Sequence, residues 1–167
     1  MHHTLIALVE DKPGVLNRVA SLFRRRNFNI ESLTVGRTAE EGVSRMTIVI
    51  DTDPAGAQRV GAYLNKLVDV LQVEELVAGV AVARDLALVK VTVGGHDKAS
   101  LLRVVDETRA HIVDTGEQSM TLEITGEPPH VDAVIARLKP LGIIEMVRTG
   151  QVAMRRGDTA LSATQYS

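Results

Sequence analysis

The residues with the clearest chemical potential lie in two short segments near the start of the chain. In the first, Asp11 precedes the pair Pro13-Gly14, which turns the chain into an apolar repeat with helical spacing. Free backbone N–H groups at a helix start carry the positive end of the helix dipole and favour a carboxylate there. The second segment begins at Asn29, whose side-chain oxygen, like those of Asp11, accepts from an ammonium group. The two segments therefore hold the groups that bind both ends of a free amino acid.

Each of these residues also has a purely structural interpretation. Gly14 suits any strand-to-helix turn, Asp11 is a common turn residue, and Asn29 can satisfy backbone groups at the start of a strand. The run Arg24 to Arg26 ends the predicted helix, where cations complement the dipole, so a solvated face is favoured over a phosphate site.

The elements that position these residues occur twice along the chain in the order βαββαβ. The first half is predicted to have strands at 4–10, 28–37, 43–51 and 70–77, and helices at 14–26 and 54–68. The second half is predicted to have strands at 86–93, 111–116, 119–126 and 142–148, and helices at 97–110 and 129–140. We therefore expect an α+β fold of two ferredoxin-like sandwiches, each with two helices over one face of a sheet.

The first strand is apolar on both of its faces. Leu5, Ala7 and Val9 point to one side, and Ile6 and Leu8 point to the other. An apolar face that the two helices do not cover usually meets a partner chain, so we expect self-association through it.

Composition narrows the class of protein. The 167 residues are 45% hydrophobic and 24% charged, which is typical of a globular protein, and a net charge of −2 gives no footprint for nucleic acid. No apolar run reaches the ~20 residues of a membrane span. The absence of cysteine fits a reducing compartment, so we expect a cytoplasmic protein.

Three other kinds of site find little support. RNA-recognition motifs share the βαββαβ order but stack bases on aromatic side chains of the sheet, and this chain has only two Phe and two Tyr. No nucleophile and base arrangement, P-loop or G-x-S-x-G motif indicates an independent enzyme, so no catalytic residue is predicted. The five histidines have no H-x-x-x-H spacing, so no metal site is predicted.

Longer motifs resemble a known family. Asp11-Lys-Pro-Gly-Val-Leu16 resembles the first turn of an ACT domain, the amino-acid-binding regulatory module of biosynthetic enzymes. The segments Asn29-Ile-Glu-Ser-Leu-Thr-Val35 and Ser44-Arg-Met-Thr-Ile48 are similar in order and spacing to the small regulatory subunit of acetolactate synthase. The similarity continues through Leu64–Leu71 and Leu88–Val91 and into the tail at Arg155-Arg-Gly-Asp158, and so covers essentially the whole chain.

This resemblance implies a non-catalytic subunit that activates a large catalytic subunit and confers feedback inhibition by valine or another branched-chain amino acid. The effector-binding residues carried over from the family are Asp11, Gly14, Val15 and Leu16 of one chain with Asn29 and Ile30 of a second chain. A homodimer or higher assembly is therefore implied. Thiamine diphosphate, magnesium and FAD are expected on the large subunit, with no cofactor on this chain.

The resemblance also implies a division of labour between the two halves. Residues 1–78 are expected to form the ACT domain for effector binding and dimerisation, 84–160 a second ACT-like domain that contacts the catalytic subunit, and 161–167 a tail. The second half lacks a D-x-x-G turn, and Asp97 is expected to cap its first helix instead. The alternative is a stand-alone ACT-type amino-acid sensor that regulates a different enzyme or a transcription regulator.

Overall fold

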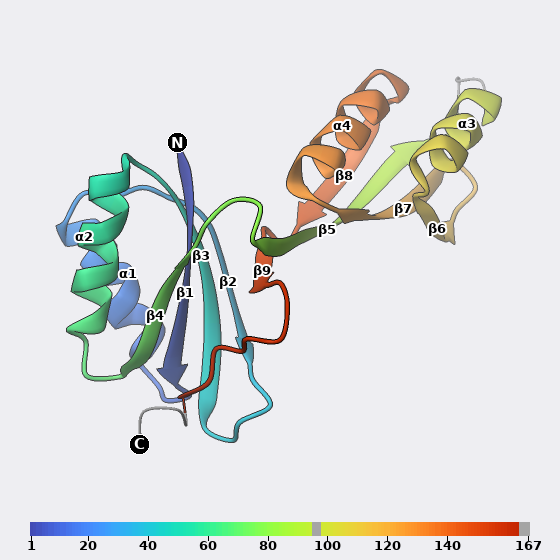
Figure 1. Cartoon of the computed structure of the whole chain (residues 1–167). Helices are drawn as coiled ribbons and strands as arrows, with labels where there is room; N and C mark the ends of the chain where they lie inside the picture. The colour runs from blue at the N-terminus through green and yellow to red at the C-terminus, as the bar shows by residue number, and fades with distance from the viewer. Residues whose placement is uncertain (95–97, 164–167) are drawn as a thin grey trace. The chain divides into compact units, whose positions relative to one another are not determined.

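The computed structural model describes residues 1–94 and 98–163 and divides the chain into two units (Figure 1). Residues Met1–Val82 and the chain from Gln151 onward form the first unit, and Ala83–Gly150 form the second. The second unit is thus an insertion between two segments of the first. Residues 151–160, which the sequence places in the second domain, group with the first unit because they contact the strands of its sheet.

The first unit has the predicted βαββαβ order. Its elements are β1 (His2–Glu10), α1 (Val15–Arg25), β2 (Ile30–Arg37), β3 (Val43–Asp51), α2 (Pro54–Asn65) and β4 (Val70–Leu76). The four strands form an antiparallel sheet in the order β2-β3-β1-β4, and α1 and α2 lie together on one face of it (Figure 1). Aliphatic side chains and Phe23 fill the space between helices and sheet, so the core needs few aromatic residues.

Local sequence signals set the ends of these helices. Asn27 adopts φ 56° after α1, the left-handed conformation that asparagine tolerates at a helix end. Asp53 caps α2, with its Oδ1 accepting from the backbone N–H of Gly56 at 2.6 Å, and Pro54 occupies the first helical position.

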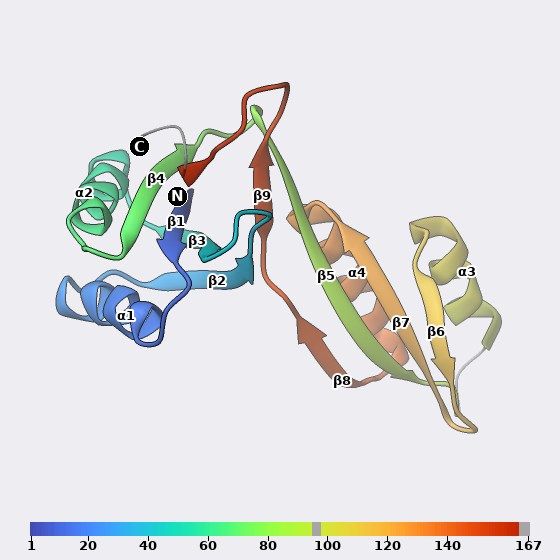
Figure 2. The same cartoon turned by 90° about the horizontal axis from the view of Figure 1, so that it is seen from below.

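The outer face of the first sheet is covered by the chain itself. Strand β9 (Val152–Arg155) lies on the opposite side of this sheet from α1 and α2 (Figure 2). Ile6 and Leu8 are 0% and 2% exposed within the single chain. The expectation that a partner chain covers this face is therefore wrong, because the returning C-terminal segment already does so.

The second unit repeats the same arrangement around its own core. Its elements are β5 (Ala81–Thr92), α3 (Lys98–Thr108), β6 (His111–Thr115), β7 (Ser119–Gly126), α4 (Pro128–Leu138), a 3-10 turn (Lys139–Leu141) and β8 (Ile143–Arg148). The strand order along the sheet is β6-β7-β5-β8. The predicted α+β fold of two ferredoxin-like halves is confirmed, whereas the expected Asp97 cap lies outside the described residues.

A charge network with one buried carboxylate, Asp85, joins three elements of the second unit. Arg148 on β8 donates from Nε to Asp85 Oδ2 at 2.7 Å and from Nη1 to Asp132 Oδ1 of α4 at 2.6 Å. Burial alone lowers the pKa of Arg148, but the hydrogen bonds to Asp132 and Asp85 outweigh it and raise the pKa above its ordinary value.

Within the described part of the chain, no helix is long and apolar enough to cross a membrane.

Candidate functional site

The turn before α1 leaves backbone donors free at the helix start. Gly14 is the N-cap residue, with φ 87° and ψ −11°, and it has no side chain to cap the helix. The first turn of α1 holds no acidic residue, so none of its side chains neutralises the positive end of the dipole. A side chain at Gly14 would be strained by the positive φ rather than by crowding, because the atoms that a Cβ at this position would meet first, all in Arg18, are 3.7 Å or more away.

The two residues that follow Gly14 have different surroundings. Val15 is only 3% exposed and packs in the core between helices and sheet, so its side chain is not available to a ligand. Leu16 is 48% exposed and presents its side chain to solvent at the same helix start. The expected binding role of Val15 is thus limited to its main chain.

A charged cluster beside this turn was not predicted from the sequence. The Arg18 guanidinium, which lies next to Gly14, approaches the buried carboxylate of Asp69 at 2.6 Å, without the alignment of a hydrogen bond. Lys12 pairs with Glu10 and lies 3.7 Å from Asp69. These contacts raise the pKa of Lys12, with the hydrogen bond to Glu10 as the largest cause. Sequence spacing gave no signal, because Asp69 meets α1 only in the folded unit.

Asp11 lies beside the hairpin between β2 and β3. Its backbone N–H donates to the oxygen of Gly42 at 2.8 Å, and its Oδ2 lies 3.3 Å from Nε of Arg37. These residues line a cleft of about 340 Å³ together with Thr38 and Glu40. Arg37 is 87% exposed, so the pair is a weak surface interaction that a ligand's ammonium group can replace.

Asn29 and Ile30 lie at the other end of the same sheet. Ile30 pairs with Ile50 on β3, and Ile50 pairs with His3 at the beginning of β1, whereas Gly14 follows the end of β1. The seven-residue step from His3 to Glu10 corresponds to roughly 24 Å of strand. One chain therefore brings Asp11, Gly14, Val15 and Leu16 together but keeps the other two predicted residues apart from them.

The environment of Asn29 leaves an acceptor for a ligand. Its Nδ2 donates to Glu31 Oε1 at 2.9 Å, so the amide oxygen remains as the acceptor.

His2, Glu31 and Asp51 bring possible metal-ligand atoms within 4.8 Å of one another, and all three residues are exposed. A hydrogen bond from the Met1 amine lowers the pKa of Asp51, so this carboxylate already has a cationic partner.

Both halves of the chain match models of known families. Residues 5–72 match the AHAS small subunit-like ACT domain, where AHAS is acetohydroxyacid synthase, another name for acetolactate synthase. Residues 84–157 match the model described as the small subunit of acetolactate synthase. These matches, with the paired βαββαβ units and the glycine turn, define a regulatory protein of the ACT-domain class.

Individual relatives agree along almost the whole chain. The acetolactate synthase small subunit of Mycolicibacterium smegmatis is 42% identical over 163 residues, which cover 98% of this chain and 96% of the relative. The probable small subunit of Archaeoglobus fulgidus is 45% identical over 158 residues, covering 95% of this chain and 99% of the relative. The crystal structure of the Thermotoga maritima small subunit has a TM-score of 0.89 at 36% identity and covers 95% of this chain and 99% of its own.

The chain belongs to the family of acetolactate synthase small subunits. The resemblance predicted from the sequence is confirmed. Membership makes this a regulatory, non-catalytic subunit, and it implies a large catalytic subunit as its partner.

Proposed function

We propose that this protein activates the large, thiamine-diphosphate-dependent subunit of acetolactate synthase and makes it sensitive to valine or another branched-chain amino acid. The observation that carries the proposal is the uncapped start of α1 at Gly14, next to a cleft that contains Asp11. The first helical N–H groups favour the effector's carboxylate, and the Asp11 carboxylate favours its ammonium group. In this proposal magnesium and FAD, like thiamine diphosphate, belong to the large subunit, and the complex works in the cytoplasm.

We further propose that each effector site is shared by two chains. Among the described strands, β2 pairs only with β3, so it presents an edge with unpaired backbone groups. If two copies of β2 pair antiparallel about a twofold axis, the Ile30 end of one strand lies beside the Arg37 end of the other. Because Arg37 contacts Asp11, this pairing brings Asn29 of the partner subunit toward the Gly14 turn.

Sharing the site explains how binding is transmitted. An amino acid held between two subunits is bound tightly only when the subunits are packed correctly, so the ligand stabilises one packing of the dimer. The usual strength of such coupling is ~1–3 kcal/mol. A pocket built with apolar side chains such as Ile30 separates valine from leucine or isoleucine by about one methylene, which is worth only ~1–3 kcal/mol.

The test uses the purified protein with a purified acetolactate synthase large subunit. Acetolactate formation is measured with and without this chain, and calorimetric titration with valine, leucine and isoleucine follows effector binding. We expect this chain to raise turnover and at least one of the three amino acids to bind and lower it again. An unchanged turnover would refute the activating role, and unchanged turnover on adding all three amino acids would refute the feedback role.

A further inference from the structure

A second cleft, of about 330 Å³, lies between the C-terminal parts of α1 and α2. Its lining consists of Leu22, Arg25, Arg26, Tyr63, Lys66 and Leu67. Leu22 is 7% exposed and Leu67 packs against the core, so apolar side chains form part of the lining, and the three cations are exposed. This cleft is separate from the one that contains Asp11, with which it shares no lining residue.

Two of the three cations lie near one aromatic ring. The guanidinium carbon of Arg26 lies 4.1 Å from the centre of the Tyr63 ring, and the amine of Lys66 lies 5.9 Å from it. Across the described residues, no carboxylate pairs with Arg25, Arg26 or Lys66. The like charges therefore repel one another without a counter-charge from the part of the chain that the structure describes.

The helix dipoles do not account for this much positive charge. Each helix C-terminus is equivalent to about half a negative charge, so the ends of α1 and α2 together offset about one cation. The three cations of the cleft, Arg25, Arg26 and Lys66, lie at these ends, and neither helix contains an aspartate or a glutamate. A basic helical face on a chain whose net charge is −2 indicates a surface for an anionic partner.

We propose that this cleft binds an acidic segment of the large catalytic subunit that also carries an apolar side chain. The inference rests on the proposed function for the identity of the partner. Carboxylates would pair with Arg25 and Lys66, while the apolar side chain would contact Leu22 and Leu67. Stacked nucleic-acid bases fit poorly, because Arg26 already covers the Tyr63 ring.

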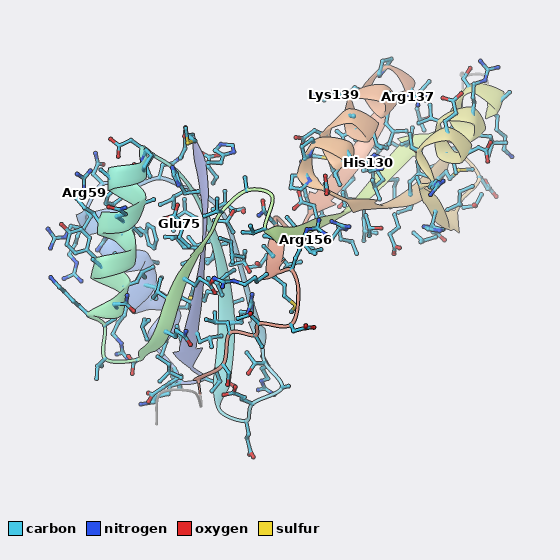
Figure 3. All side chains as sticks on the ribbon, viewed as in Figure 1. Arg59, Glu75, His130, Arg137, Lys139 and Arg156 are labelled. Carbon is cyan, nitrogen blue, oxygen red and sulfur yellow. The ribbon has the colours of Figure 1, made fainter. Side chains whose placement is uncertain are left out.

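Charge reversal tests the proposal with matched controls on the same helices. Lys66→Glu and Arg25→Glu change cations that line the cleft, whereas Arg59→Glu and Arg24→Glu make the same charge change outside the lining. Arg59 lies on α2 (Figure 3). The dissociation constant for the purified large subunit is measured for each variant at 50 and 300 mM KCl. Melting temperature and valine binding by the free protein are measured in parallel.

We expect each cleft variant to weaken binding about tenfold or more at low salt and each control to weaken it less than about threefold. The difference between wild type and cleft variants should shrink at high salt, because ions screen the lost pairs. Equal affinities for cleft and control variants would overturn the proposal. Failure of the wild type to bind the large subunit would instead overturn the proposed function. If a charge-reversed variant has a lowered melting temperature, Lys66→Gln, which removes the charge without reversing it, replaces it in the test. Lys66→Gln is expected to weaken binding to the large subunit as well. Wild-type affinity of Lys66→Gln would also overturn the proposal.

Discussion

The guanidinium of Arg45 on β3 donates from Nη2 to the backbone oxygen of Ala153 at 2.8 Å, although the two residues are 108 positions apart. Residues 151–155 contact each strand of the first sheet through a hydrogen bond or an ion pair. Gln151 bonds to Thr4 on β1 and accepts from Thr34 on β2, and Arg155 pairs with Glu74 on β4. The pKa of Arg45 is lowered below its ordinary value, because burial partly withdraws the charged guanidinium from water at this contact.

Replacing Arg45 with methionine should loosen this segment. The methionine keeps an apolar stem over the sheet but leaves the Ala153 oxygen without its charged donor, which we expect to lower the free energy of unfolding by ~1–3 kcal/mol. Urea unfolding measures the loss, and faster amide exchange in residues 152–155 localises it. Arg24→Met, at an exposed position with no carboxylate partner among the described residues, is the control and should change stability by less than ~0.5 kcal/mol. Equal losses in both variants would contradict a specific contact.

The insertion topology predicts which fragments fold. A chain in which a flexible linker replaces residues 83–150 keeps the hydrogen bonds of Gln151 and Ala153 with the first sheet and should unfold cooperatively. Residues 1–82 alone should be much less stable, because Ile6 and Leu8 lose the segment that covers them, and full burial of each is worth ~1.5–3 kcal/mol. Thermal unfolding and sedimentation compare the two fragments. Similar stability of both would show that β9 contributes little.

Short-range rules account for the parts of the fold that were predicted correctly. Period-two and helical apolar patterns located the strands and helices, and Gly14, Asn27 and Asp53 mark ends that depend on one residue's backbone or side chain. Strand β9 was missed because four residues carry too little pattern, and the contacts that order it come from strands far away in the sequence.

The candidate site also has parts that the sequence predicted and parts that it did not. The turn at Asp11 and Gly14 follows from local sequence, and the structure has the expected uncapped helix start. The Asp69 carboxylate beside Arg18 could not be predicted, because it depends on how β4 begins next to α1. The separation of Asn29 from Gly14 follows only from the strand order, in which β2 and β1 run in the same direction with β3 between them.

The charge network in the second unit should be costly to break on the side of its buried carboxylate, Asp85. Arg148→Met leaves the Asp85 carboxylate, which is 4% exposed, without its cation, and we expect a loss of ~3–5 kcal/mol in unfolding free energy. Asp132→Ala removes the other carboxylate, which is 65% exposed, and should cost less than ~1 kcal/mol. The double variant Arg148→Met with Asp85→Leu should recover most of the loss. Denaturant unfolding of the three variants decides this, and a double variant less stable than Arg148→Met would contradict it.

Gly14→Asp should abolish the response to valine. Aspartate tolerates the left-handed backbone at this position, and its carboxylate would lie near the Arg18 guanidinium at the helix start, where the effector's own carboxylate is proposed to bind. Gly14→Asn is the matched control, since it has the same size without the charge and should weaken binding less. Calorimetry should show at least about tenfold weaker binding for the aspartate variant. Normal inhibition of a holoenzyme that contains it would place the effector elsewhere.

Mixed dimers test whether two chains share the site. Neither Gly14→Asp nor Asn29→Ala should bind valine alone, because each damages every site of its own dimer. In a dimer of one chain of each kind, one site combines both substitutions and the other combines the intact Gly14 of one chain with the intact Asn29 of its partner. Random exchange makes half of the dimers mixed, so about a quarter of all sites should recover on mixing.

Calorimetric titration of the mixture measures this recovered fraction, and titration of each variant alone gives the baseline. Sedimentation checks that both variants remain dimeric. If each site were built within one chain, a mixed dimer would contain one site damaged at Gly14 and one damaged at Asn29, and no binding would return. The roughly 24 Å that one chain places between these two residues makes that outcome physically unreasonable for a single small effector. A lack of recovery would therefore contradict a site shared by two chains, whereas normal valine binding by Asn29→Ala alone would remove Asn29 from the site and leave the Gly14 turn as the position of the carboxylate.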